Sequence, residues 1–158
     1  IVGGKFLYKP DQIRGVDFPD SGYRHEITHK VGVIEKHPVT TGVSPQFDIN
    51  DELYLSHVFT DSVIPLLSSN YDYTDGNFYS SKQAVAGTMF SREGWQHPPG
   101  HNLIGWVKHY KNSPIVYLQC GDSKAAYDNP DYQKLLSNAI AWVASDEAKA
   151  WARQQNND

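Results

Sequence analysis

The chain has 158 residues, of which 39% are hydrophobic and 13% aromatic, enough for one domain with a packed core. Its 14 Lys and Arg residues against 18 Asp and Glu residues lack the basic surplus that binding to nucleic acid or to a membrane surface requires. The single cysteine, Cys120, excludes an internal disulfide. No apolar run approaches the roughly 20 residues that span a bilayer, so we expect a cytoplasmic protein without nucleic-acid or membrane partners.

The first 24 residues contain repeated glycine and proline and predict irregular structure. The chain opens on Ile1-Val-Gly-Gly4, with neither a methionine nor a signal peptide. We therefore expect the later part of a longer chain, arriving from an upstream element.

Two segments alternate apolar and polar residues with the period of a half-buried strand. In residues 25–34 the apolar side includes His29. In residues 47–55 the alternation assigns Asp51 to the apolar side and Glu52 to the opposite side, so we expect these neighbouring acids to face different surroundings.

Three more strands are predicted further along the chain. Residues 63–67 form a short apolar strand in which Pro65 indicates an edge or a bulge. Residues 68–82 predict a polar, aromatic-rich loop. Residues 103–110 and 115–119 predict a hairpin, and the almost continuously apolar second strand is typical of one covered on both faces.

The C-terminal part predicts two helices. Asn129 is suited to cap the first, residues 131–144, with Pro130 at its first position. Its apolar stripe, which includes Leu136 and Ile140, is expected to pack on the strand at 115–119. A second helix is expected from Ala148 to about Gln155.

Several short segments follow one another in a fixed order and spacing. They are Val2-Gly-Gly-Lys-Phe6, His37-Pro-Val-Thr-Thr-Gly42, Phe47-Asp-Ile-Asn-Asp-Glu-Leu-Tyr54, Gly105-Trp-Val-Lys-His-Tyr110, Ile115-Val-Tyr-Leu-Gln-Cys-Gly-Asp122 and Tyr127-Asp-Asn-Pro130, followed by Leu135-Leu136 and Ala139-Ile-Ala-Trp-Val-Ala144. Each segment alone is weak, but together they resemble the ThuA-like family of trehalose utilisation over nearly all of residues 1–144.

The resemblance implies an α/β fold, namely a flavodoxin-like, class I glutamine-amidotransferase-like three-layer sandwich. Residues 1–158 would form a single, incomplete domain with its first βα units missing and a strand-rich insertion. The implied function is in sugar catabolism, on trehalose or a related 3-keto-glycoside. Two departures matter. Many relatives have Gly-His where this chain has Gly121-Asp122, so imidazole chemistry at that point would give way to a carboxylate. Many also have a Gly-Lys-Gly turn where this chain has Lys111-Asn-Ser-Pro114.

Candidate site residues come from the residue pattern together with this resemblance. Asp122 follows an apolar strand, where open α/β sheets place their ligand crevice. Glu52 shares a strand face with Tyr54, and His37 stands at a turn before proline. We predict catalytic roles for Asp122, Glu52 and His37, with Asp122 and His37 in one cleft. The alternatives are a turn cap for Asp122 and His37 and a solvated strand edge for Glu52.

Aromatic residues suit carbohydrate because sugar rings stack on them. The chain offers Tyr71, Tyr73, Phe78 and Tyr79 in the loop at 68–82, together with Trp95 and Trp106. Together with Tyr54, Trp106 and Tyr127 are the predicted ligand-binding residues, and core packing is the alternative for such rings. The expected ligand is a small-molecule sugar. A non-catalytic carbohydrate-binding or interaction module on the same fold is the alternative function, and a homo-oligomer or a chain completing the missing half stays open.

Histidine is frequent, with seven in the chain, and leaves a divalent metal open. His97 and His101 could meet across a turn, with His57 or Asp122 completing a site. His25 and His29 would lie about 13 Å apart along one strand, too far for one ion. Cys120 lacks the flanking glycines of a nucleophile elbow and is expected to be a buried structural residue.

Overall fold

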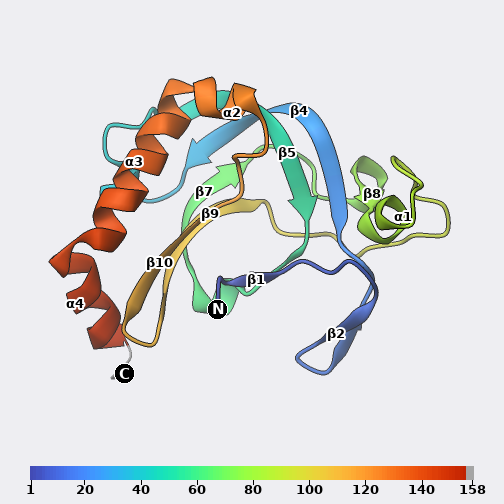
Figure 1. The fold of residues 1–158 in the computed structure, drawn as a ribbon, viewed down its shortest axis with the longest axis horizontal. Coiled ribbons are helices and arrows are strands. Elements are labelled where there is room, and N and C mark those ends of the chain that lie inside the picture. The colour runs from blue at the N-terminus through green and yellow to red at the C-terminus, as the bar shows by residue number, and fades with distance from the viewer. Residues whose placement is uncertain (156–158) are drawn as a thin grey trace.

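The computed structural model describes residues 1–155, which are built around an antiparallel sheet of six strands (Figure 1). The strand order is β10-β9-β7-β4-β5, and β8 pairs with one end of β4. The strands are β4 (Gly22–Val33), β5 (Gln46–Leu55), β7 (Ile64–Ser69), β8 (Tyr79–Ser80), β9 (Leu103–Tyr110) and β10 (Ser113–Leu118).

Shorter elements surround this sheet. The first 24 residues, predicted to be irregular, contain β1 (Gly4–Lys5), β2 (Asp11–Ile13) and β3 (Val16–Phe18) and lead into β4. β1 pairs with β6 (His57–Val58), and β2 pairs with β3. The loop predicted at 68–82 holds the 3₁₀ turn η3 (Asp75–Asn77), β8 and the start of α1 (Ser81–Val85); the remaining 3₁₀ turns are η1 (Pro38–Thr40) and η2 (Thr60–Ser62).

The predicted alternation in β5 is confirmed. Phe47, Ile49, Asp51, Leu53 and Leu55 are all buried on one face. The residues between them point the other way, and of these Glu52 alone is buried. The sequence therefore places two adjacent acids on opposite faces of one strand, and both are removed from bulk water.

A β-bulge interrupts the pairing of β4 with β5. Arg24 lies opposite Leu53, but the next paired residue of β4 is Ile27, opposite Asp51, so β4 has one extra residue here. Glu26 within the bulge has φ of 50°, a conformation that few residues other than glycine adopt. The bulge changes which side of the sheet the preceding residues face.

The predicted hairpin of β9 and β10 is confirmed, with Ser113 opposite Tyr110. However, β9 is the strand buried on both faces, whereas β10 lies at the edge of the sheet and its residues are half-buried. The apolar character of β10 reflects α3 and α4 on one side. Pro65 produces a register shift in β7, as the bulge alternative predicted, but β7 is a central strand and not an edge.

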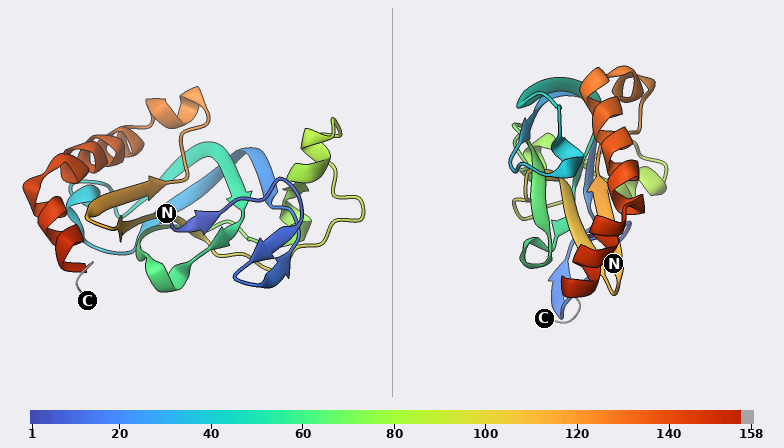
Figure 2. Two further views of the ribbon diagram at one scale, coloured as in Figure 1. Left: turned by 60° about the horizontal axis from the view of Figure 1, so that its bottom comes forward. Right: turned by 90° about the vertical axis from the view of Figure 1, so that its left-hand side faces the viewer.

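Three helices follow the hairpin: α2 (Lys124–Asp128), α3 (Pro130–Ala144) and α4 (Asp146–Gln155). The predicted cap of α3 is confirmed, because the Asn129 side chain accepts hydrogen bonds from the backbone N–H groups of Asp131 and Tyr132. α3 and α4 lie along one side of the sheet, and α1 with β8 lies at the opposite end (Figures 1 and 2).

The buried face of α3 differs from the predicted stripe. Its buried residues are Tyr132, Leu135, Ala139 and Trp142. Ile140 is 62% exposed, and Leu136 is half-buried and lines an open groove beside β10. The helix is rotated because Trp142 packs toward the turn at His37, with ring centroids 4.6 Å apart, and not toward β10 alone.

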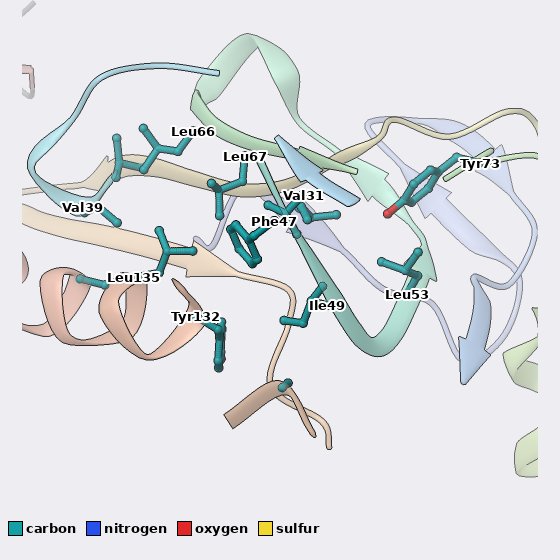
Figure 3. Packing of buried hydrophobic residues seen from close by; sticks show 14 of the residues in the cluster. Val31, Val39, Phe47, Ile49, Leu53, Leu66, Leu67, Tyr73, Tyr132 and Leu135 are labelled. Atoms are coloured by element: carbon teal, nitrogen blue, oxygen red, sulfur yellow. The ribbon is translucent and has the colours of Figure 1, made fainter. Parts of the chain in front are cut away.

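The core lies between the sheet and α2–α4. Figure 3 shows Phe47 and Ile49 of β5 facing Leu135 and Tyr132 of α3, with Val31 of β4 beside its pairing partner Phe47. Burying side chains of this size stabilises the fold by about 1.5–3 kcal/mol each. This packing fixes β5 and thereby the acids that it carries.

The architecture is mixed α/β, as predicted, but every strand pairing among the described residues is antiparallel. The parallel sheet of a flavodoxin-like sandwich is therefore not the sheet seen in residues 1–155. Within the same residues, no helix combines the length and the apolar character needed to cross a membrane.

Candidate functional site

A cleft of about 490 Å³ opens at the bulged end of the β4–β5 pair. Its lining comes from segments far apart in the sequence: Arg24, His25 and Glu26; Asp51 and Glu52; Tyr79, Met89 and Phe90; and Asp122 and Ser123. The cleft combines carboxylates, an imidazole and aromatic rings in one concave surface.

Asp51 holds the loop that follows β10. Its carboxylate accepts hydrogen bonds from the backbone N–H groups of Gly121, Asp122 and Ser123, at 2.5, 3.2 and 3.2 Å. Gly121 has φ of 128°, and a Cβ atom there would lie 2.5 Å from the Tyr132 hydroxyl, so the loop needs glycine at this point. Asp51 thus fixes the backbone position of Asp122 through three hydrogen bonds.

Glu52 lies on the opposite face of β5, within the cleft. It is 7% exposed, and its carboxylate accepts a short hydrogen bond from the Tyr54 hydroxyl. Burial raises the pKa of Glu52, while the Tyr54 hydrogen bond and nearby His25 oppose the rise and Asp122 adds to it. Burial also raises the pKa of Tyr54, as does its hydrogen bond to Glu52. Tyr54 therefore stays a protonated donor that orients Glu52.

His25 reaches the cleft because of the β4 bulge. Its Nδ1 atom lies 3.2 Å from Oε1 of Glu52. Its ring packs edge-on against Tyr23 and Phe90, with centroid separations of 4.9 and 6.1 Å. The sequence alternation had put His25 on the same face as His29. The extra residue in the bulge moves it to the face of Glu52, while His29 stays buried.

Together, His25, Glu52 and Asp122 form a compact polar group. One ligand-type atom from each lies within 4.8 Å of the others, and Asp122 is exposed to the cleft. Within residues 1–155, His25 is the only basic side chain at ion-pair distance from Glu52, and no Lys or Arg pairs with Asp122. Among the residues that the structure describes, neither Glu52 nor Asp122 therefore forms an ion pair with a Lys or Arg side chain.

The aromatic residues divide between the cleft and the core. Phe90 is 58% exposed at the cleft wall, and Tyr79 beside it packs under the guanidinium group of Arg92, 4.6 Å from the ring centroid. Tyr73 and Phe78 are buried against one another. The core-packing alternative thus holds for Tyr73 and Phe78, whereas Tyr79 and Phe90 face the cleft.

His37 is not part of this cleft. It caps η1, where its Nδ1 atom accepts a hydrogen bond from the backbone N–H of Val39, and its ring contacts Trp142. Burial lowers the pKa of His37. The depression beside it is lined by residues between Val33 and Pro45 and includes none of the cleft residues. The predicted grouping of His37 with Asp122 is therefore wrong, because His37 satisfies its own turn.

The predicted ligand-binding aromatics lie in other surroundings. Trp106 is 2% exposed; its Nε1 donates to the carbonyl oxygen of Val2, and its ring stacks on Tyr117 with centroids 4.1 Å apart. Tyr127 is 49% exposed, packs edge-on against Tyr132 and does not line the cleft. Trp106 is part of the packing. Tyr54 does not line the cleft itself, but its hydroxyl donates to Glu52, which does.

The histidines proposed for a metal do not converge. The His101 Nδ1 accepts a hydrogen bond from the backbone N–H of Leu103, and the ring of His57 packs against Phe18 and Phe59. In the described part of the chain, the group with metal-ligand spacing is His25, Glu52 and Asp122. The sequence indicated Glu52 and Asp122 but not His25, because no residue pattern predicts the bulge in β4.

Cys120 is not suited to act as a nucleophile. Burial raises the pKa of its thiol to about 12, so the thiolate that attacks a substrate is scarce at neutral pH. Its carbonyl oxygen accepts a hydrogen bond from the Tyr132 hydroxyl at 2.6 Å. The structure thus agrees with the prediction of a structural cysteine.

Comparisons with known proteins point to one family. A family model described as trehalose utilisation, ThuA, matches residues 1–143. A solved structure of a ThuA-like protein from Parabacteroides merdae is similar in fold, with a TM-score of 0.54 at 18% sequence identity. The match covers 90% of this chain but 48% of the solved one, so this chain spans about half of that protein. No curated protein matches.

Proposed function

The chain belongs to the ThuA family of trehalose utilisation, and we propose that it processes trehalose or a related glycoside, including a 3-keto-glycoside, in the cleft that contains Glu52 and Asp122. The observation that carries this proposal is the convergence of His25, Glu52 and Asp122, from three distant segments, on one cleft. A perturbed carboxyl group beside a second carboxylate is typical of catalytic sites.

The cleft suits a sugar in its shape and chemistry. Carboxylate oxygens accept hydrogen bonds from sugar hydroxyl groups. The exposed ring of Phe90 offers an apolar face on which the C–H side of a sugar ring can stack, and Tyr79 lies beside it. A volume of about 490 Å³ falls in the range of small-ligand sites.

Glu52 and Asp122 differ in burial and in freedom of movement, and the two properties suit different tasks in binding and turnover. Glu52 is buried and held by Tyr54, so it presents a fixed acceptor. Asp122 is exposed, and the Asp51 clamp fixes its backbone while its side chain stays free for a ligand. These residues hold the oxygen atoms of the reacting part of the sugar, and a preorganised charge arrangement of this kind favours developing charge in the transition state.

A turnover assay with matched variants tests the proposal. The 158-residue chain is incubated with trehalose and with a 3-keto-disaccharide, and the products are followed by chromatography. We expect Asp122→Asn to lower turnover by about 100-fold or more while thermal stability stays unchanged. Asp128→Asn is the control, because Asp128 is an exposed acid of α2 paired with Lys124.

Equal turnover by the wild type and Asp122→Asn would contradict the proposal. Sugar binding by calorimetry without any turnover would instead support the alternative of a non-catalytic carbohydrate-binding module. Tyr79 and Phe90 favour that alternative to the extent that ring stacking alone retains the sugar.

The finer fold assignment belongs to the same proposal. A flavodoxin-like, amidotransferase-like sandwich would require βα units beyond residues 1–158, from the same polypeptide or from a partner. The apolar groove beside edge strand β10, lined by Val116, Leu118 and Ile140 among others, supports such a neighbour. A cytoplasmic location is proposed with it, and cell fractionation tests that part.

A further inference from the structure

We propose that His25, Glu52 and Asp122 bind one divalent first-row transition metal ion, and that this ion binds the keto oxygen and the adjacent hydroxyl group of a 3-keto-glycoside. The metal site follows from the geometry of the cleft. The substrate half rests on the proposed function, and the two parts can be tested separately.

The donor set fits such an ion. One imidazole nitrogen and two carboxylate oxygens lie within 4.8 Å of one another, so a small movement brings all three to the roughly 2.0–2.2 Å at which nitrogen and oxygen bind such ions. A mixture of imidazole and carboxylate favours ions such as Mn²⁺, Co²⁺ or Zn²⁺ over those held by oxygen alone. The three donors come from β4, β5 and the loop after β10 and approach from the protein side, which leaves coordination positions toward the cleft.

The charges of the cleft call for a cation. Glu52 is 7% exposed, and Asp122 lies beside it. Two carboxylates in such proximity repel one another, and a buried charge costs free energy unless it is paired. Arg24 also lines the cleft, but its guanidinium group donates to the Tyr79 hydroxyl at 2.7 Å and forms no ion pair with either acid. A divalent ion would neutralise both carboxylates at once.

Each donor is held by a neighbour that would be an outer-shell partner of the ion. The Tyr54 hydroxyl orients Glu52, and Asp51 fixes the backbone of Asp122. The rings of Tyr23 and Phe90 hold His25. Outer-shell contacts of this kind orient metal ligands and raise affinity, and their loss costs about 10–100-fold.

The open side of the ion selects the substrate chemistry. A ketone beside a hydroxyl group offers two oxygens to one ion, and a metal polarises a carbonyl as a Lewis acid. Phe90 lies on the same wall, where it can contact the C–H face of the sugar. A sugar with a keto group is therefore expected to bind more tightly in the presence of the ion than trehalose, which has no carbonyl.

The test measures the metal alone, without any sugar. The untagged 158-residue chain is treated with a chelator, dialysed and titrated with Mn²⁺, and free Mn²⁺ is followed by electron paramagnetic resonance; calorimetry with Zn²⁺ and Co²⁺ runs in parallel. We expect one ion per chain. We expect His25→Gln, Glu52→Gln and Asp122→Asn each to weaken binding at least about tenfold, and Asp128→Asn to leave it unchanged.

Two results would overturn the metal site: no ion binds, or binding persists unchanged in all three variants and so belongs to other histidines. Circular dichroism of each variant shows whether it is folded. Because Asp122 is exposed, Asp122→Asn is the variant expected to disturb folding least. If no ion binds but Asp122→Asn still abolishes turnover, the metal inference fails and the proposed function stands. If the ion binds but no sugar is turned over, the proposed function fails and the metal site stands.

Discussion

The two faces of β5 carry adjacent acids with different tasks. On the core face Asp51 accepts three backbone hydrogen bonds from the loop at Gly121–Ser123 and is 1% exposed. On the other face Glu52 contacts the side chains of Tyr54 and His25 and lines the cleft. The same chemical group is thus a structural clamp on one face and a candidate ligand-binding group on the other.

The difference lies in what each carboxylate meets. Three backbone N–H groups occupy most of the acceptor sites of the Asp51 carboxylate. Side chains, and not backbone groups, contact Glu52: the Tyr54 hydroxyl donates to its carboxylate, and His25 Nδ1 lies 3.2 Å from its Oε1. An acid in a strand is therefore better judged by its partners than by its burial, because both of these acids are buried.

The largest loss of stability is expected from truncating a buried side chain on the core face of β5. Leu53 is fully buried between Asp51 and Leu55, and Leu53→Ala should lower the free energy of unfolding by about 2–5 kcal/mol, through lost burial and the cavity left behind. Urea denaturation measures it. A loss below about 1 kcal/mol would show that this face of β5 does not anchor the fold.

Asp51→Asn should lower the free energy of unfolding by about 1–3 kcal/mol. An asparagine keeps one acceptor oxygen but turns an N–H₂ group toward backbone donors. Asp48→Asn is the matched control on the other face, where Asp48 forms an exposed ion pair with Lys30 worth about 0–1 kcal/mol. Equal losses in the two variants, by urea denaturation, would remove the distinction between the faces.

The sequence predicted this distinction but not the complete site. Alternation in β5 assigned Asp51 and Glu52 to opposite faces, and the apolar strand before Asp122 indicated a ligand-binding position; the structure brings Glu52 and Asp122 together. His25 was missed because a bulge depends on how two strands pair, which the pattern of one strand does not reveal.

His37 and α3 show where the sequence pattern suggested roles that the structure does not give them. His37 looked like a site residue, yet its ring nitrogen caps η1. Ile140 fits the helical period of the apolar stripe but is exposed, because tertiary packing against Trp142 and the turn at His37 sets the rotation of α3. Local patterns thus define elements, and the contacts between elements decide which polar groups remain free.

A smaller effect is expected from pH. His29 of β4 lies opposite Ile49 and is buried, and burial lowers its pKa although nearby Asp51 opposes the shift. The unfolded chain therefore binds a proton more readily than the folded one, so stability should be full above about pH 6.5 and fall as the pH drops below it. His29→Gln should reduce this fall between pH 7.5 and 5.5, measured by urea denaturation at each pH. An identical fall in both proteins would contradict the assignment.

The smallest effect on stability is expected from Tyr54→Phe. The change removes one hydrogen bond to Glu52 at the cleft, worth about 1 kcal/mol or less. Mn²⁺ affinity should nevertheless fall by about tenfold, because Glu52 loses the group that orients it. The comparison of the two faces would weaken if stability fell strongly while Mn²⁺ affinity stayed the same.

The most direct test of the site is to map where a sugar binds. Amide ¹H–¹⁵N spectra of the chain are recorded during titration with a 3-keto-disaccharide in the presence of Zn²⁺, which is diamagnetic and does not broaden the signals. We expect the shifts to concentrate at Gly121–Ser123, at His25 and Glu52, and at Tyr79 and Phe90. Shifts confined to the turn at His37–Gly42, with the Gly121–Ser123 loop unchanged, would contradict the account.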